Sequence, residues 1–329
     1  MNKLALTLAT RDYDCLAPLA CGDVTLESIE LQFRRTPPGT ALSSAADALN
    51  LTLNDSSVHA GELSFGRYVI RLAQGDHSFV GVPFFPVRGF KHRSFFVRRG
   101  SGLQELKSLE GRRIGIVGWS STGNIWSRAA LREQGVQLDR IQWWMGLVDR
   151  SLSGPPKETP PPHVRLTPPN RSLMEMLLAG EIDAITCTDP PSGFYEANGS
   201  IVRLLSDYKR GEEDYYRRTS VYPAHHIIGI RREVFDRDPW VAQNLYLALE
   251  QSKIRWQSRL RQTMGMIPWL LGDIEDTQTL MGRGWNSSGT GPNRRTIQTL
   301  CDEILAQELI AHPIDGEAVF AEFEKVMGN

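Results

Sequence analysis

Residues 111–135, GRRIGIVGWSSTGNIWSRAALREQG, decide the fold more directly than any other stretch of this chain. Residues 114–117 are apolar and mostly β-branched, which predicts a buried strand. Residues 118–123 are rich in glycine and hydroxyl side chains, and the dozen residues after them have helical spacing and end near Gly135. A strand that enters a helix through such a loop is typical of α/β proteins.

The same alternation of strand-like and helix-like runs extends along the chain and predicts an α/β fold. Residues 268–326 are expected to form two or three helices, and the proline-rich residues 152–169 a surface loop of polyproline II character. We expect strands at residues 4–9, 29–34, 79–83, 93–97, 141–145, 182–187 and 225–230, and helices at residues 43–53, 66–74, 173–178 and 239–261.

Composition limits the classes of function. A chain of 329 residues predicts two domains or one large one. The 37 Lys and Arg residues nearly balance the 38 Asp and Glu residues, so we expect neither nucleic-acid binding nor attraction to anionic membranes. No stretch has the roughly 18 uncharged apolar residues that a spanning helix requires.

The first strand and the cysteines indicate a cytoplasmic protein. Arg11 and Asp12 interrupt the apolar run at residues 4–9 too early for a signal peptide, and its leucines alternate as in a strand. The four cysteines form no CxxC pair, so neither a disulfide scaffold nor a cysteine zinc site is expected. The chain also lacks Gly-x-Ser-x-Gly, a GxGxxG after the first strand, and His-Glu-x-x-His, so serine hydrolases, Rossmann dehydrogenases and zincins have no support.

The segment of residues 120–124 is the first candidate binding site. Ser121, Thr122 and Asn124 would lie at a helix N-terminus, where backbone N–H groups and the helix dipole favour a carboxylate or phosphate. Ordinary N-capping by Ser or Thr is the alternative.

Two charged segments supply further candidates. Arg88 has a planar fork that matches a carboxylate, and His92 could transfer a proton near neutral pH; both could equally be solvent-facing residues of a basic turn. Arg11 follows the first strand, at the edge where open α/β sheets bind ligands, or it is a loop charge without function.

His225 and His226 begin a strand, where neighbours face opposite sides, so at most one of the two can face a given site. Glu62 and Ser64 precede a helix and could cap it or contact a ligand. Asp189 lies before a Pro-Pro turn and is either a site carboxylate or a turn residue.

Several segments together resemble the bacterial 4,5-dihydroxyphthalate decarboxylases. The resemblance covers nearly the whole chain, and its motifs occur in the same order as in that family. They are TRDYD (10–14), GELSFGRYV (61–69), GVPFFPVRGFKHRSFFVRR (81–99), LEGRRIGIVGWSSTGNIW (109–126), AGEIDAITCTDPP (179–191), YYRRTSVYPAHHIIGIRREVF (215–235) and PWVAQNLYLA (239–248). The chain differs from the family at Thr10-Arg11, where a Cys-Gly pair is usual, and in a longer 152–169 segment.

That resemblance implies a two-lobed fold like that of type 2 periplasmic binding proteins, with two crossover strands. Residues 1–92 and 225–329 would form one lobe and residues 93–224 the other, with a ligand cleft between them. Arg11, Glu62, Ser64, Arg88 and His92 would line one wall, His226 the hinge, and the facing wall would carry the remaining candidates, Ser121, Thr122, Asn124 and Asp189.

The resemblance also implies a reaction. The expected enzyme is a carbon-carbon lyase that protonates the ring of a hydroxylated aromatic carboxylate similar to 4,5-dihydroxyphthalate and releases CO2. His92 and His226 would transfer protons, with Glu62 orienting one of them, and Arg11 or Arg88 with the Ser121–Thr122 loop would bind carboxylates. No cofactor is expected, although a divalent metal is possible, and an oligomer is possible.

Three other functions are compatible with the sequence. The chain could be a solute-binding protein that captures an aromatic or other anion without catalysis, because fold does not decide function. It could catalyse another reaction on a related aromatic carboxylate. It could also be a regulator's effector domain, although it lacks a helix-turn-helix segment.

Overall fold

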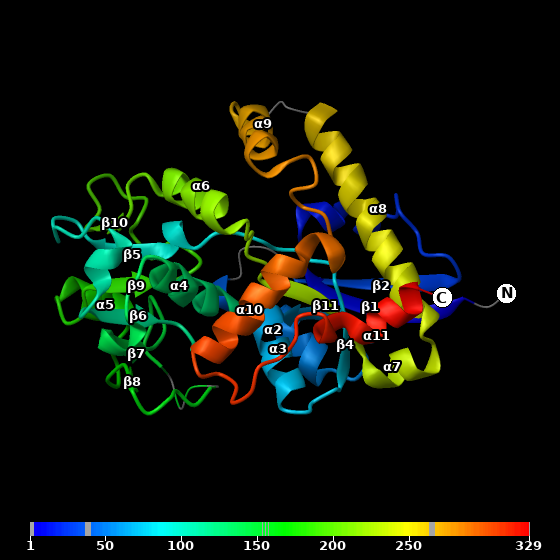
Figure 1. Ribbon diagram of the computed structural model, residues 1–329, viewed down its shortest axis with the longest axis horizontal. Helices are drawn as coiled ribbons and strands as arrows, with labels where there is room; N and C mark the ends of the chain where they lie inside the picture. The colour runs from blue at the N-terminus through cyan, green and yellow to red at the C-terminus, as the bar shows by residue number, and fades with distance from the viewer. Residues whose placement is uncertain are drawn as a thin grey trace. The chain divides into compact units, whose positions relative to one another are not determined.

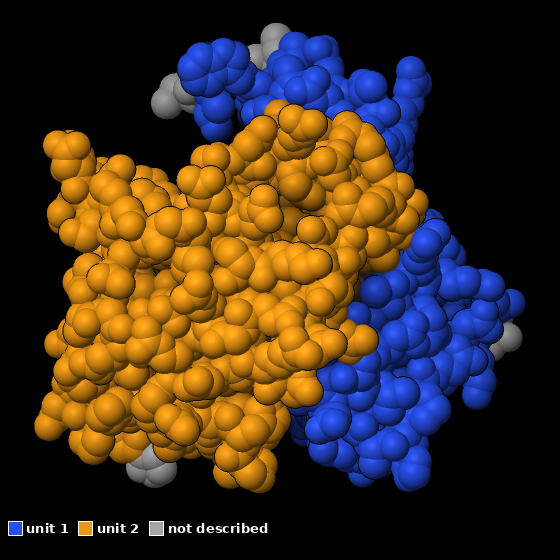
Figure 2. Space-filling model, turned by 60° about the vertical axis from the view of Figure 1, so that its left-hand side comes forward, with its two compact units in different colours: residues 1–88, 224–329 blue, residues 89–223 orange. Residues whose placement is uncertain are grey.

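The computed structural model describes residues 3–36, 41–152, 154, 156, 158–262 and 267–328. The chain divides into two compact units, which Figure 2 distinguishes by colour. Unit 1 consists of residues 1–88 and 224–329, and unit 2 of residues 89–223. The boundaries expected from the sequence, 92/93 and 224/225, differ by four residues and one residue, so that residues 89–92 are part of unit 2.

Unit 1 is built on a mixed five-stranded sheet in which β11, from late in the chain, lies among N-terminal strands (Figure 1). β1 pairs in parallel with β2 and β3, whereas β11 runs antiparallel to β3 and β4. In the order β2-β1-β3-β11-β4 the strands are Ile29–Thr36, Leu4–Arg11, Ala60–Ser64, His226–Arg231 and Phe79–Val82.

Both faces of this sheet are covered, so residues 6–10 of β1 are buried whichever face they point to. Leu6 and Leu8 join one core cluster, and Thr7 and Ala9, which point to the opposite face, are also buried. Polar side chains at the strand ends therefore lie next to a sheet that is buried on both faces. The helices of unit 1 are α1 (Ala17–Ala20), α2 (Ala41–Asn54), α3 (Phe65–Ala73), α7 (Arg232–Arg237), α8 (Trp240–Gln262), α9 (Leu270–Met281), α10 (Arg294–Ala306) and α11 (Ala321–Met327).

Unit 2 has a six-stranded sheet in the order β10-β5-β9-β6-β7-β8. Its helices are α4 (Thr122–Glu133), α5 (Leu173–Leu178) and α6 (Tyr208–Thr219), and the single turn η2 (His92–Ser94) precedes β5. In sheet order the strands are Ile201–Arg203, Phe95–Arg98, Ala184–Thr186, Arg113–Ile116, Gln142–Met145 and Val164–Leu166.

The strand predicted at residues 114–117 is β6, near the middle of this sheet. It pairs in parallel with β7 and β9, and Ile114 and Ile116 are fully buried. Gly115 lets α5 pack closely, because a Cβ at that position would lie 2.8 Å from a methyl group of Leu173. The strand–loop–helix passage into α4 is confirmed, and with it the predicted α/β fold.

Some element predictions were wrong in detail. Residues 152–169, expected to be a loop, contain β8; Val164 is buried opposite Trp143 of β7, so an edge strand forms despite the surrounding prolines. Arg93 lies in η2 rather than in a strand, and α6 was not predicted because its sequence is almost wholly polar. Within the part of the chain that is described, no helix is long and apolar enough to cross a bilayer.

Candidate active site

Glu62 and His226 form a hydrogen-bonded pair at the end of the unit 1 sheet. Glu62 lies in β3 and His226 begins β11, where Ile228 is opposite Glu62 in the register. Side chains two residues apart on a strand share a face, so His226 is the diagonal neighbour of Glu62. Nδ1 of His226 is hydrogen-bonded to Oε1 of Glu62.

Tyr13 and Arg11 complete this cluster from the residues at the end of β1. The Tyr13 hydroxyl donates to the same Glu62 Oε1 at 2.5 Å and lies 3.5 Å from Nδ1 of His226. The backbone N–H of Arg11 donates to Glu62 Oε2 at 3.0 Å, and Nε of its guanidinium lies 3.9 Å from Oε1. Glu62 thus has both carboxylate oxygens occupied while its side chain is fully buried.

The charges of the cluster favour an ionised Glu62. Burial raises the pKa of Glu62, but the positive charge and hydrogen bond of His226, with Arg11 and the Tyr13 hydroxyl, outweigh burial and lower it below its usual value. Burial and the Glu62 carboxylate raise the pKa of Tyr13 well above its usual value. Tyr13 therefore stays a hydrogen-bond donor at neutral pH.

This arrangement is suited to proton transfer. A carboxylate on Nδ1 fixes the imidazole tautomer and stabilises the imidazolium form. The Nε2 atom of His226 has no hydrogen-bond partner among the residues with described positions, and the side chain is 13% exposed, so a small molecule can reach it. His226 can accordingly accept or deliver a proton at Nε2.

The two neighbouring candidates, His225 and Ser64, lie beside the pair. Ser64 is opposite His226 in the strand register and is buried just before α3. His225 precedes β11, and its backbone N–H donates to Val87. Of the two adjacent histidines, His226 is the one that meets the carboxylate.

Arg88 is engaged elsewhere in unit 1. Its Nη2 donates to the Ser287 carbonyl at 3.1 Å and to Oδ1 of Asn293 at 2.6 Å, and its guanidinium lies over the ring of Phe85. These bonds tie the chain after β4 to the loop before α10. The predicted role of Arg88 in carboxylate binding stays a prediction.

His92 is packed inside unit 2. Its ring meets Tyr215 of α6 edge-on, and both ring nitrogens are buried without a hydrogen-bond partner in the described structure. Burial lowers the pKa of His92 to about 4, so it is neutral at physiological pH. The predicted catalytic role of His92 likewise stays a prediction.

Two backbone N–H groups of the 118–124 loop already have hydrogen-bond acceptors within unit 2. The Glu158 carboxylate accepts the N–H groups of Trp119 at 3.1 Å and Ser120 at 2.6 Å. The Asn124 amide donates to the Gly118 carbonyl, so this side chain closes the loop. Thr122, in the first turn of α4, is buried.

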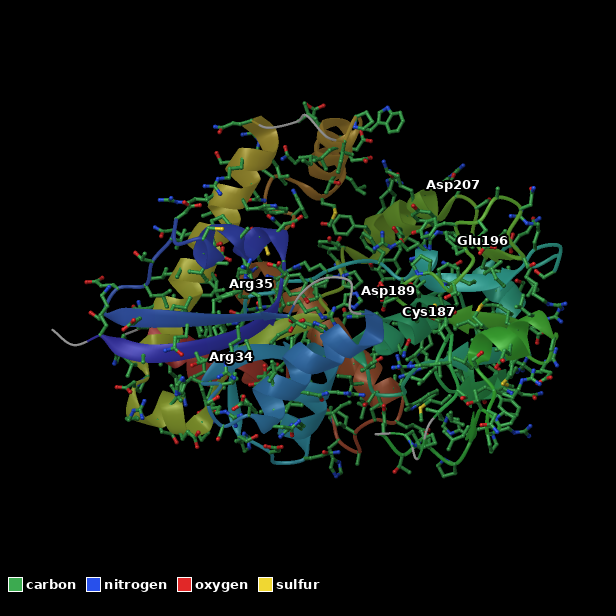
Figure 3. The ribbon with its side chains drawn as sticks, turned by 180° about the vertical axis from the view of Figure 1, so that it is seen from behind. Arg34, Arg35, Cys187, Asp189, Glu196 and Asp207 are labelled. Carbon is green, nitrogen blue, oxygen red and sulfur yellow. The ribbon has the colours of Figure 1, made fainter. Side chains whose placement is uncertain are left out.

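Asp189 follows β9 in unit 2, two residues after Cys187, as labelled in Figure 3. It is exposed, and its charge acts on Lys91 and on Cys187. Within the described ranges, no group of three or more His, Cys, Asp or Glu side chains could hold a metal ion.

Two known proteins are similar in sequence to this chain. The 4,5-dihydroxyphthalate decarboxylase of Comamonas testosteroni is 29% identical over 315 residues, which cover 94% of this chain and 92% of that enzyme. The enzyme of the same name from Pseudomonas putida is 29% identical over 227 residues, 67% of this chain and 84% of that one. This chain is therefore similar in sequence to two 4,5-dihydroxyphthalate decarboxylases, one of them over nearly its whole length. No protein-family model matches it.

Solved structures show the fold of this chain. The periplasmic aliphatic sulphonate binding protein of Escherichia coli aligns with a TM-score of 0.52, at 15% identity and 96% coverage of both chains. The alkanesulfonate-binding protein of Xanthomonas axonopodis pv. citri, bound to MOPS, gives a TM-score of 0.51 at 17% identity, covering 97% of this chain and 98% of that one. The predicted periplasmic-binding-protein-like fold is confirmed.

Two polar residues with buried or paired side chains were not predicted as site residues. Tyr13 lies within the quoted TRDYD motif and was given no role, although its place two residues beyond β1 is the signal that could have found it. Lys91 lies within the quoted GFKH segment but has no periodicity that marks it as buried. Both become visible only when the strands and η2 are in place.

Proposed function

We propose that this protein is a carboxy-lyase that removes CO2 from a hydroxylated aromatic dicarboxylate of the 4,5-dihydroxyphthalate type. The observation that carries the proposal is the Glu62–His226 pair, with Nε2 of His226 open to a ligand. The similarity to two decarboxylases of that name, one over 94% of the chain, supports the substrate class.

The proposed reaction follows from the electronic structure of a phenolic acid. A direct loss of CO2 would leave an electron pair in an sp² orbital of the ring, which is unfavourable. A hydroxyl para to the carboxylate-bearing carbon donates electron density to that carbon, so the carbon can take up a proton. The carbon–carboxylate bond then breaks, its electron pair restores the aromatic ring, and CO2 leaves. One proton consumed per carboxylate balances the reaction.

The cluster of unit 1 supplies the groups that this reaction requires. Nε2 of His226 delivers the proton to the ring carbon, and the Glu62 carboxylate stabilises the imidazolium beforehand. The Tyr13 hydroxyl holds Glu62 in place from the other side. The Arg11 side chain is 31% exposed, with its Nε 3.9 Å from Oε1 of Glu62, and is proposed to bind a substrate carboxylate.

A protein that only binds an anion is the competing function. The similarity to sulphonate-binding proteins shows the fold and does not favour that function. Binding alone would not need an ionised, fully buried glutamate on a histidine ring, because such a buried charge is costly unless it is paired.

The test is CO2 release from a panel of hydroxylated phthalates and benzoates, each with and without a chelator. We expect release from 4,5-dihydroxyphthalate and none from phthalate, which lacks the activating hydroxyls. The matched control for a His226→Asn variant is His77→Asn, because His77 is an exposed histidine of the same unit. Tight binding of 4,5-dihydroxyphthalate without CO2 release, under both conditions, would contradict the proposal.

A further inference from the structure

The outer face of α8 carries an exposed row of large apolar side chains. The inner face of this helix, which includes Leu245 and Leu249, joins the core of unit 1. Trp240, Leu247 and Ile254 are 38%, 50% and 59% exposed. Residues seven apart lie on the same face of a helix, so these three form one row, on the side away from the core. Single exposed apolar side chains are normal, whereas a continuous row is typical of an interaction surface.

No charged residue interrupts this row. Gln243 and Gln251, which lie between its apolar members at helical spacing, are both uncharged. The outer side of an amphipathic helix on a protein surface normally carries charged residues. Depletion of charge together with exposed Trp and aliphatic side chains is instead the composition of the centre of a protein–protein interface.

The chain itself gives little cover to the C-terminal end of α8 and to α9. Beyond Lys253, none of the described side chains of α8 is buried, and α9 has no buried residue. Trp269, which directly precedes α9, is 76% exposed. Figure 1 shows both helices at the same end of unit 1, and Nζ of Lys253 donates to the Asn286 carbonyl at 2.9 Å and to Oγ of Ser288 at 2.7 Å, which ties α8 to the segment after α9. We call Trp240, Leu247, Ile254 and Trp269 the α8–α9 surface.

The distribution of charge along the chain makes this surface complementary to itself. Residues 255–262, at the end of α8, contain three arginines and no acidic residue. Residues 233–238, just before α8, contain three acidic residues and one arginine. If two copies of α8 run antiparallel, the basic end of each lies beside the acidic segment of the other. A parallel pair would place the two basic ends together, which is repulsive.

We propose that the α8–α9 surface binds a second copy of this chain, with the two α8 helices antiparallel about a two-fold axis at Leu247. Such an axis places Ile254 of one copy opposite Trp240 of the other, because each is seven residues from Leu247. A closed two-fold dimer is the commonest symmetric assembly of soluble proteins. The proposal concerns unit 1 alone and does not depend on the proposed reaction.

The size of the surface determines the strength of the dimer. A helix of 23 residues is about 35 Å long and about 10 Å wide, so α8 alone would cover about 350 Å² per copy. The 12 residues of α9 would raise this area to about 500 Å². Stable interfaces cover about 800 Å² per partner, and weaker, reversible complexes cover less. The dimer is therefore expected to be reversible, and its population to depend on concentration.

The experiment is sedimentation equilibrium of the full chain from about 1 to about 200 μM, a range that suits a weak interface. We expect the average mass of wild type to rise with concentration from monomer towards dimer and no further. Leu247→Glu should raise the dissociation constant at least tenfold, because two carboxylates would meet at the two-fold axis. Leu178→Glu, at a leucine of α5 in unit 2 that is 48% exposed, is the matched control and should leave the dissociation constant unchanged. Circular dichroism would confirm that both variants are folded.

Disulfide trapping tests the orientation of the two helices. The background is Cys21→Ser, because Cys21 is an exposed free cysteine. On mild oxidation, a mixture of Trp240→Cys and Ile254→Cys chains should form a disulfide between the two variants, and Ile254→Cys alone should not. Formation of a disulfide dimer by Ile254→Cys alone would show a parallel pair and overturn the proposal.

Two other results would also overturn the proposal. One is a wild type that stays monomeric at about 200 μM, which would assign the α8–α9 surface to a different protein or to a lipid surface. The other is a dimer whose dissociation constant in folded Leu247→Glu is within twofold of wild type. None of these measurements involves turnover, so failure of the decarboxylase proposal would leave them interpretable.

Discussion

Glu62 and His226 are 164 residues apart in the chain and share a hydrogen bond between two inner strands of one sheet. Their contact depends on β11 being placed between β3 and β4, which brings His226 diagonally opposite Glu62. A shift of the register by one residue would turn His226 to the other face of the sheet and break the pair. The pairing of β3 with β11 is therefore the structural basis of the proposed proton transfer.

Glu62→Gln should reduce kcat about 100-fold or more, because an amide cannot stabilise the imidazolium of His226 in the way a carboxylate does. KM should change much less, since Glu62 does not face the ligand. The measurement is kcat and KM across pH, with Glu30→Gln, an exposed residue on β2, as the matched control. Unchanged kcat and an unchanged pH profile in folded Glu62→Gln would contradict a positioning role.

Tyr13→Phe should slow turnover roughly tenfold to a hundredfold, which corresponds to about 1.5–3 kcal/mol for a lost hydrogen bond to a charged group. The aromatic ring remains, so packing against the unit 1 core should persist. Steady-state kinetics with a circular-dichroism control would measure this. Wild-type turnover in Tyr13→Phe would show that the hydroxyl is dispensable.

The Glu62 carboxylate should also make stability depend on pH. Its pKa in the folded protein is below the usual value of 4.5, so its contribution to stability is full above about pH 4.5 and is lost as the pH falls through the lower folded pKa. Urea unfolding from pH 6 to pH 3 should show a steeper loss for wild type than for Glu62→Gln. Parallel curves for the two proteins would contradict the lowered pKa.

Arg88→Ala should lower stability because two acceptors, the Ser287 carbonyl and Asn293, lose a charged donor. The expected loss is about 1.5–3 kcal/mol in the free energy of unfolding, measured by urea denaturation. Phthalate affinity of the folded variant should fall less than tenfold. A larger loss of affinity at unchanged stability would instead support the carboxylate-binding role predicted from the sequence.

Local sequence patterns predicted the elements of the fold better than the contacts of the site. The apolar run of β6 and the hydroxyl-rich loop before α4 could be recognised because strands and helix starts leave short-range signals. β8 was missed because an edge strand of three residues among prolines has no such signal. Residues 152–169 also supply Glu158, whose carboxylate occupies part of the predicted anion site, and no sequence pattern indicates that contact.

For the site residues as well, the sequence indicates suitable residue types but not their contacts. Glu62 and His226 could be nominated from their residue types and from the family resemblance, but their contact depends on long-range strand order. Arg88 and His92 had equally suitable chemistry. In the structure, however, Arg88 donates to Asn293, and the ring of His92 packs against Tyr215. Lys91 was overlooked because burial of a lysine depends on tertiary packing around it.

The most direct test is CO2 release from 4,5-dihydroxyphthalate by wild type and by His226→Asn, with phthalate binding measured on the same samples. The account predicts steady release by wild type, and a folded His226→Asn that binds phthalate as wild type does but releases CO2 at least about 100-fold more slowly. Release at the wild-type rate by His226→Asn would contradict the assignment of the proton donor.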